Sequence, residues 1–254
     1  VNYDEDAGVD ESDDGTDVRR ARIYVKGNVA GDWKYKVQYD FSEGVMKDMY
    51  ITYTGSDVGN IVVGQAAPAM FLESYTSSKW TTFIERAVVD NFALDREQGV
   101  GFQRAGENYS IYTSVTGDNM EDDEEGDDGA SYAARLTISP LHETGSVAHI
   151  GFTALYEDRN ESKTAFGARP ASKVDSTSKL VQSEVASADA RSTYGVELAM
   201  VSGSFSAQAE HVIVEVDGHQ VDDEEYTASY GQMSFFLTGE SRSYYEDGGI
   251  FDAP

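Results

Sequence analysis

Apolar and polar side chains alternate along most of this chain. Between 19 and 29, Ile23 and Val25 share one face of an extended segment, while Arg22 and Lys26 share the other. A period of two predicts β-strands with one apolar and one polar face. Eleven such strands are predicted, at 19–29, 33–41, 47–54, 60–65, 100–104, 109–116, 131–140, 147–156, 191–201, 204–216 and 226–237.

The connections between these strands alternate between short and long. Tight turns such as AGD and SGS contrast with the long stretches 66–97, 117–130, 157–190 and 217–225. Bacterial outer-membrane barrels have short periplasmic turns and longer extracellular loops, whereas a soluble sandwich has no reason for this asymmetry. The sequence also contains no run of about eighteen apolar residues that would form a spanning helix. We therefore predict an all-β fold, an antiparallel transmembrane β-barrel.

An odd number of strands does not close a bacterial barrel. We therefore expect residues 1–254 to be a single barrel domain that is incomplete, with one strand missing before Val1. The stretch 66–97 is then the third extracellular loop, which in porins folds into the pore. Helical spacing of Phe71, Leu72, Tyr75 and Trp80 predicts a short helix between 72 and 86 that forms the constriction. The charged residues of this predicted constriction loop are Lys79, Arg86, Glu73 and Glu85.

The charge of the chain is strongly negative and unevenly distributed. The 254 residues include 46 acidic and 19 basic side chains, a net charge of −27, which makes nucleic acid an unlikely partner. The stretches 4–17, 117–129 and 215–225 hold eight, eight and six of the acids, and the remainder is nearly balanced. We interpret these stretches as solvated loops. Divalent-cation binding is the alternative, but an EF-hand fails because Tyr132 would occupy the position of the bidentate Glu.

Basic side chains gather on one strand face near the start of the chain. Alternation assigns that face to the lumen, because the opposite face is apolar or aromatic. Fixed cations in a water-filled channel raise the local concentration of anions. Pairing with acids such as Asp40 and Asp48 is the competing interpretation. The predicted pore-lining bases are Arg20, Arg22, Lys26, Lys34, Lys36 and Arg135.

Catalytic and metal motifs have no support in the sequence. The chain has no cysteine, and its four histidines lie in none of the spacings typical of a metal site or a nucleophilic hydrolase. We expect no enzyme activity, no cofactor and no metal site.

Several ordered blocks of sequence carry a family likeness: RRARIYVKG, DWKYKVQYDF, KDMYITYTG, GNIVVGQ, LESYTSSKWTTFIERA, REQGVGF and FLTGESRSY. Together they resemble the phosphate-selective porin O and P family. The resemblance implies a sixteen-stranded barrel, usually a trimer, whose third loop narrows a channel lined by basic residues. On that template the chain covers strands two to twelve, which agrees with the odd count.

The leading functional hypothesis is an outer-membrane porin for passive diffusion of small anions such as phosphate. Its expected partners are small anions, outer-membrane lipid and lipopolysaccharide, and two further copies in a homotrimer. One alternative is a general or weakly cation-preferring porin. The other is a soluble acidic β-sandwich adhesin that binds calcium.

Overall fold

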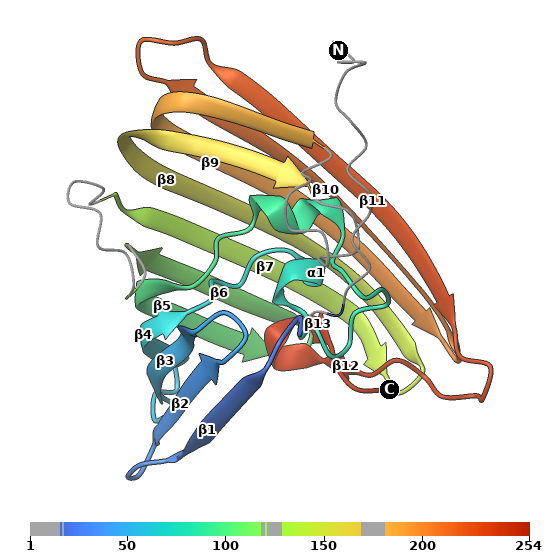
Figure 1. Cartoon of the computed structure of the whole chain (residues 1–254). Helices are drawn as coiled ribbons and strands as arrows, with labels where there is room; N and C mark the ends of the chain where they lie inside the picture. The colour runs from blue at the N-terminus through green and yellow to red at the C-terminus, as the bar shows by residue number, and fades with distance from the viewer. Residues whose placement is uncertain (1–15, 17, 118–119, 121–128, 169–180) are drawn as a thin grey trace.

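Eleven antiparallel strands form one curved sheet in the computed structural model, which describes residues 16, 18–117, 120, 129–168 and 181–254 (Figure 1). Each strand pairs with its neighbours in sequence order, so the predicted meander is confirmed. Within the described residues, β1 and β11 each pair on one side only, and the sheet is open. The strands are β1 (Arg22–Asn28), β2 (Trp33–Asp40), β3 (Val45–Tyr53), β4 (Asn60–Ala66), β5 (Glu97–Gly106), β6 (Tyr109–Thr116), β7 (Ser131–Glu143), β8 (Ser146–Ala168), β9 (Val181–Ser202), β10 (Phe205–Gly218) and β11 (Glu224–Phe235).

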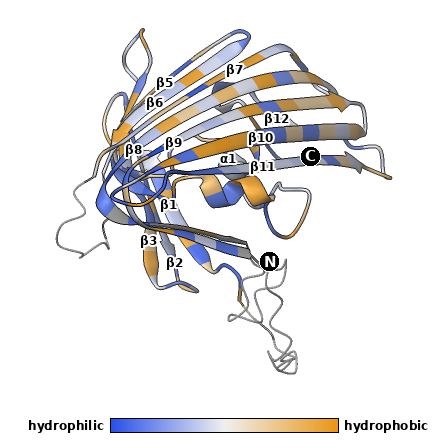
Figure 2. Cartoon of the chain, turned by 90° about the horizontal axis from the view of Figure 1, so that it is seen from above, coloured by the Kyte–Doolittle hydropathy of each residue, from blue (hydrophilic) through white to orange (hydrophobic). Residues whose placement is uncertain are grey.

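The register of the first strands fixes which side chains share a face. Arg22 pairs with Asp40 and Lys26 with Lys36 across β1 and β2, while Lys36 pairs with Tyr50 across β2 and β3. Because facing residues of an antiparallel pair project to the same side, the predicted basic face is a single surface. We call it the inner face, since the long β4–β5 connection covers it. In Figure 2 the sheet curves around the helix of that connection.

The opposite, outer face carries exposed apolar side chains along the strands, among them Ile51, Val63 and Phe152. Aromatic pairs mark its two ends. Trp33 and Tyr53 lie 4.9 Å apart, centroid to centroid, near the short turns, and Tyr132 and Tyr156 lie 6.4 Å apart near the long loops. An apolar band between aromatic belts is typical of a membrane-facing barrel surface. No helix in the described parts of the chain has the length and hydropathy to cross a bilayer.

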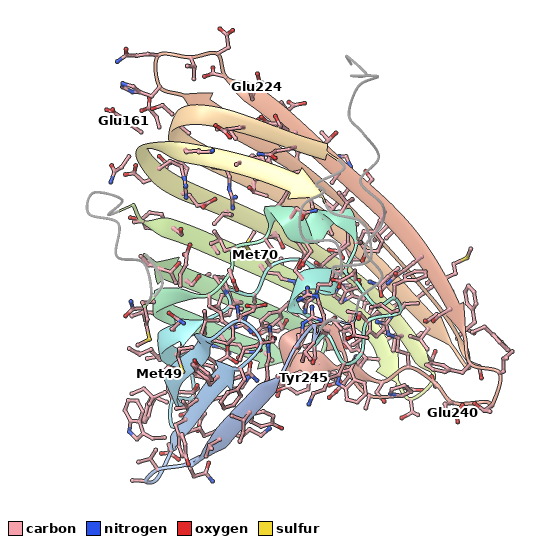
Figure 3. All side chains as sticks on the ribbon, in the orientation of Figure 1. Met49, Met70, Glu161, Glu224, Glu240 and Tyr245 are labelled. Atoms are coloured by element: carbon pink, nitrogen blue, oxygen red, sulfur yellow. The ribbon has the colours of Figure 1, made fainter. Side chains whose placement is uncertain are left out.

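The long-loop end differs from the prediction. The stretch 157–190 was expected to be a loop, but β8 continues to Ala168 and β9 begins at Val181, with register shifts between Asp158 and Thr164. Likewise β10 and β11 take up most of 215–225. Figure 3 shows Glu161 and Glu224 at this end and Glu240 at the other. The acidic stretches 4–17 and 117–129 fall almost entirely outside the described residues.

Residues 67–96 form the inner loop, which lies on the inner face. Its helix α1 spans only Leu72–Tyr75, and a 3-10 turn, η1, spans Val88–Phe92. The helix predicted for 72–86 is therefore a single turn. It ends at Thr76, whose backbone is extended, and Ser77 and Ser78 follow, residues that favour turns over helix interiors.

The chain after β11 returns to the inner face. There β12 (Tyr244–Tyr245) pairs with β13 (Ile250–Phe251), and the 3-10 turn η2 (Glu246–Gly248) lies between them. In Figure 1 this segment lies close to α1. The sequence analysis did not predict it. Its two strands are too short for alternation to be visible.

Candidate functional site

An apolar patch on β8 to β10 anchors the inner loop. Phe71 and Val89 of the loop pack against inward side chains that include Leu155, Val212 and Val214, all of them buried. This part of the inner face is apolar although the sequence analysis expected a polar lumen. The inner loop covers this patch, so its apolar side chains are shielded from water.

Polar contacts then fix the orientation of α1. Glu210 on β10 accepts hydrogen bonds from the backbone N–H groups of Leu72 (2.9 Å) and Glu73 (2.8 Å), and from the Tyr230 hydroxyl (2.5 Å). These N–H groups belong to the first turn of the helix and have no partner within it. One buried carboxylate therefore satisfies both and holds the start of the loop against the sheet.

Glu73 continues this network toward the end of the chain. Its carboxylate accepts a hydrogen bond from Gln208 (2.9 Å), and Gln208 in turn accepts one from Arg242 (2.7 Å). Burial raises the pKa of Glu73, even though Arg242 and Arg86 favour its charged form. We call Glu73, Gln208, Glu210, Tyr230 and Arg242 the anchor network.

A cavity of about 660 Å³ lies between the inner loop and the inner face of β1 to β6. Its lining includes eight basic and four acidic side chains, so its charge is positive although the chain as a whole is strongly negative. We call it the basic cavity. The bases are Arg19, Arg20, Arg22, Lys36, Lys47, Lys79, Arg86 and Arg96, and the acids are Glu43, Asp48, Asp90 and Asp95.

Most of these bases have acidic partners. Asp40, which is fully buried, lies 2.5 Å from Arg22. Asp48 bridges Lys36 (2.5 Å) on the strand wall and Arg96 (2.6 Å) at the end of the inner loop. These pairs tie the loop to the wall and reduce the local field, as the competing interpretation of the sequence anticipated.

Arg20 and Lys79 are different. Among the described residues, neither has a carboxylate oxygen within 4.0 Å of its side-chain nitrogens. Burial, together with the guanidinium groups of Arg19, Arg22 and Arg86, lowers the pKa of Arg20. The charges of Arg20 and Lys79 are therefore less offset than those of the paired bases around them.

Three lysines also approach the ring of Tyr24. The Nζ atom of Lys79 lies 5.7 Å from the ring centroid, that of Lys36 5.9 Å and that of Lys26 6.0 Å. Lys79 comes from the inner loop and the other two come from the sheet. The cluster therefore spans the space between loop and wall, where a passing solute would meet charges from both sides.

Not every residue predicted from the sequence lines this cavity. Lys26 and Lys34 are exposed on the inner face, nearer the short turn between β1 and β2. Glu85 lies 2.8 Å from Arg19, beside the cavity, and Glu73 belongs to the anchor network. Arg135 is buried: it lies 2.5 Å from Glu197 and donates to the carbonyl oxygens of Gly248 and Gly249. It thereby holds the β12–β13 segment in place.

The sequence analysis missed Arg19, Lys47 and Arg96. Lys47 precedes Asp48, so strict alternation places it on the outer face. A bulge between β2 and β3, where Gln38 pairs with Asp48 but Tyr39 pairs with Met46, interrupts the alternation and turns Lys47 inward. Its Nζ atom lies 2.5 Å from Glu43, and the side chain lines the cavity.

Comparison with known proteins agrees with this architecture. The chain is 30% identical to Porin O of Pseudomonas aeruginosa over 92% of its own length and 61% of that protein. It is 27% identical to an uncharacterized protein of Caulobacter vibrioides over 91% of its length and 49% of that protein. The chain thus spans about half to three-fifths of these relatives. Residues 1–252 match the family described as phosphate-selective porin O and P, whose members are outer-membrane porins, and the chain belongs to this family.

Proposed function

We propose that this chain forms part of an outer-membrane channel for passive diffusion of small anions, with phosphate as the expected solute. The observation that carries the proposal is the basic cavity, where, among the described residues, no carboxylate oxygen lies within 4.0 Å of the side-chain nitrogens of Arg20 or Lys79. The family description, phosphate-selective porin O and P, supports the same class of solute.

The arrangement of bases along β1 suggests how an anion moves. Arg22 and Lys26 lie on the inner face of β1 four residues apart, roughly 13 Å along the strand. Arg20, which also lines the cavity, lies two residues before Arg22. An anion released by one base therefore meets the next within a short distance. Conduction requires binding that is strong enough for entry and weak enough for exit, which several moderate sites achieve better than one tight site.

The inner loop would serve as the constriction in this channel. It is seated by an apolar patch and by the anchor network, and it presents Lys79 and Arg86 to the cavity. The outer apolar band would contact lipid and lipopolysaccharide, and we expect three copies to assemble. A channel of this kind is not an enzyme. Membership in a porin family speaks against the alternative of a soluble calcium-binding adhesin.

A general or weakly cation-preferring porin is the second candidate. The observation in its favour is that Arg22, Lys36 and other cavity bases are paired with acids. Block of the current by inorganic phosphate distinguishes the two candidate functions. A channel with an anion site is blocked by a bound phosphate, whereas a general pore is not.

The test is phosphate block of chloride current through the complete protein in planar bilayers. Phosphate should inhibit the wild-type channel, and R20Q combined with K79Q should weaken inhibition about tenfold if each charge contributes roughly 0.7 kcal/mol of binding. The matched control is Lys34→Gln, which removes a base from the same face but outside the cavity. An equal effect of the control, or no block of the wild type, would overturn the proposal.

A further inference from the structure

Tyrosine rings make up a second part of the cavity lining. Tyr24 comes from β1, Tyr50 from β3, Tyr75 from α1 and Tyr112 from β6, and all four border the basic cavity. The tyrosine hydroxyls can donate to an inorganic anion, but the faces of the rings offer it nothing. Four rings beside eight bases therefore fit a solute with two chemically different parts.

The rings lie so that they can receive such a solute. Tyr112 lies across Gly101 of the neighbouring strand: a Cβ atom at Gly101 would be 2.9 Å from the Tyr112 hydroxyl oxygen. The ring of Tyr75 follows, with its centroid 6.5 Å from that of Tyr112. Because position 101 carries no side chain, the Tyr112 ring rests along the wall of the sheet. The loop and the wall together form an aromatic lining.

The hydroxyl groups of this lining are largely uncommitted. Among the described residues, no hydrogen-bond partner lies within 3.5 Å of the hydroxyl oxygens of Tyr24, Tyr50 or Tyr75. In the anchor network, by contrast, Tyr230 donates to Glu210. Buried or half-buried tyrosine hydroxyls usually have a partner. The three at the cavity are available to a hydroxylated solute.

The register places the two kinds of lining side by side. Lys36 and Tyr50 face each other directly across β2 and β3, so their Cβ atoms are about 5 Å apart. Lys36 is held by Asp48. A phosphoryl group would therefore bind at Lys79, whose Nζ atom lies 5.7 Å from the centroid of the Tyr24 ring, and its substituent would lie over the neighbouring rings. The cavity volume of about 660 Å³ falls within the range of roughly 300–1,000 Å³ that is typical of sites for small organic molecules.

We propose that the basic cavity accepts organic phosphate monoesters that carry a ring, with the phosphoryl group on the bases and the ring on the tyrosines. The inference rests on the proposed anion channel and narrows its substrate class. It distinguishes this cavity from a site that selects for charge alone. Aromatic contacts of this kind contribute modestly, so the ester should bind about fivefold more tightly than inorganic phosphate.

The experiment measures block of chloride current through the complete protein by three probes: inorganic phosphate, glycerol phosphate and phenyl phosphate. Phenyl phosphate should block at the lowest concentration, about fivefold below the other two. In Tyr50→Ala and in Tyr75→Ala, taken separately, this advantage should disappear while block by inorganic phosphate persists. Tyr132→Ala, which removes a ring from the outer face, is the matched control and should leave the advantage unchanged.

The outcomes separate the two proposals. If inorganic phosphate blocks but phenyl phosphate does so no better, or if both cavity variants keep the advantage, the inference about monoesters is wrong and the anion channel stands. If none of the three probes blocks, the anion channel itself is wrong. Two cavity variants are specified because either alone could disturb folding, and block by inorganic phosphate shows that each variant forms an intact channel.

Discussion

At the scale of single residues, the carboxylates on the inner face have two distinct roles. Asp40 and Asp48 neutralise cavity bases, whereas Glu73 and Glu210 hold the inner loop. Glu73 and Glu210 share one buried network, and burial makes a charged carboxylate less stable than its protonated form. The stability of the seated loop should therefore depend on pH through Glu73.

Glu73 supports a specific pH prediction. Burial raises its pKa above the ordinary value of 4.5, so the folded protein holds this proton more tightly than the unfolded chain. The stabilisation is complete below pH 4.5 and is lost as pH rises through the higher pKa of the folded state. We expect the thermal unfolding midpoint of the detergent-solubilised protein to fall as pH rises over this range, and Glu73→Gln to make the fall shallower. If the difference in unfolding midpoint between the wild type and Glu73→Gln did not change with pH, Glu73 would not be the source of this pH dependence.

Glu210 supports a second prediction at this scale. Removing its carboxylate leaves the buried N–H groups of Leu72 and Glu73 without an acceptor, at a cost of about 1–3 kcal/mol each. Glu210→Ala should lower the unfolding midpoint measured by circular dichroism and increase fluctuations of the single-channel current. Glu215→Ala, on the outward face of the same strand, is the control and should do neither.

Single residues also show where prediction from sequence reaches its limit. Alternation placed Arg22 and Lys36 on one face correctly, because their strands pair regularly. It failed for Lys47, because a bulge shifts the phase of the strand by one residue. For Arg135 it found the inner face, but the burial of this side chain depends on Gly248 and Gly249, more than one hundred residues away.

At the scale of elements, Phe71 is one of the residues that hold the inner loop against the sheet. Phe71 has a positive φ of 49°, which costs a non-glycine residue about 1–3 kcal/mol. The ring is buried over Gly195 of β9, where a Cβ atom would lie 2.5 Å from it. Full burial of a Phe side chain contributes about 1.5–3 kcal/mol, and truncation to Ala costs about 3–5 kcal/mol. Burial therefore offsets the backbone cost, provided that position 195 remains a glycine.

This contact predicts the effect of a change in β9. Gly195→Val should displace Phe71, unseat the inner loop and raise single-channel conductance, because the constriction no longer occupies the lumen. Gly231→Val, at a β11 position with open space around its Cβ, is the matched control and should conduct as the wild type does. Unchanged conductance of a folded Gly195→Val channel would show that the loop does not set the width of the pore.

Elements differ in how well the sequence predicts them. All eleven strands of the sheet were predicted because each has a regular alternation. The extensions of β8 and β9 were not predicted, because the stretch 157–190 is polar. A strand that continues beyond the apolar band has no apolar outer face, so its sequence shows no alternation of apolar and polar residues. The helix was overestimated because the spacing of Phe71 and Trp80 fits a helix, whereas the chain leaves the helical conformation at Thr76.

At the scale of the whole molecule, the net charge and the local charge have opposite signs. Sixteen of the 46 acids lie in the two stretches outside the described residues, whereas the basic cavity has twice as many bases as acids. At physiological ionic strength, charges are screened over about 8 Å. In the proposed channel, the charges that line the cavity therefore act more strongly on a solute there than charges farther away do.

Reversal potential tests this account most directly. The complete protein is reconstituted in a planar bilayer under a KCl gradient, and the sign of the zero-current potential gives the preferred ion. The basic cavity predicts a zero-current potential whose sign indicates a preference for chloride over potassium. This preference should be smaller in R20Q combined with K79Q and should be retained in Lys34→Gln. A potential of the opposite sign, or one that the double variant leaves unchanged, would contradict the claim that these bases select the solute.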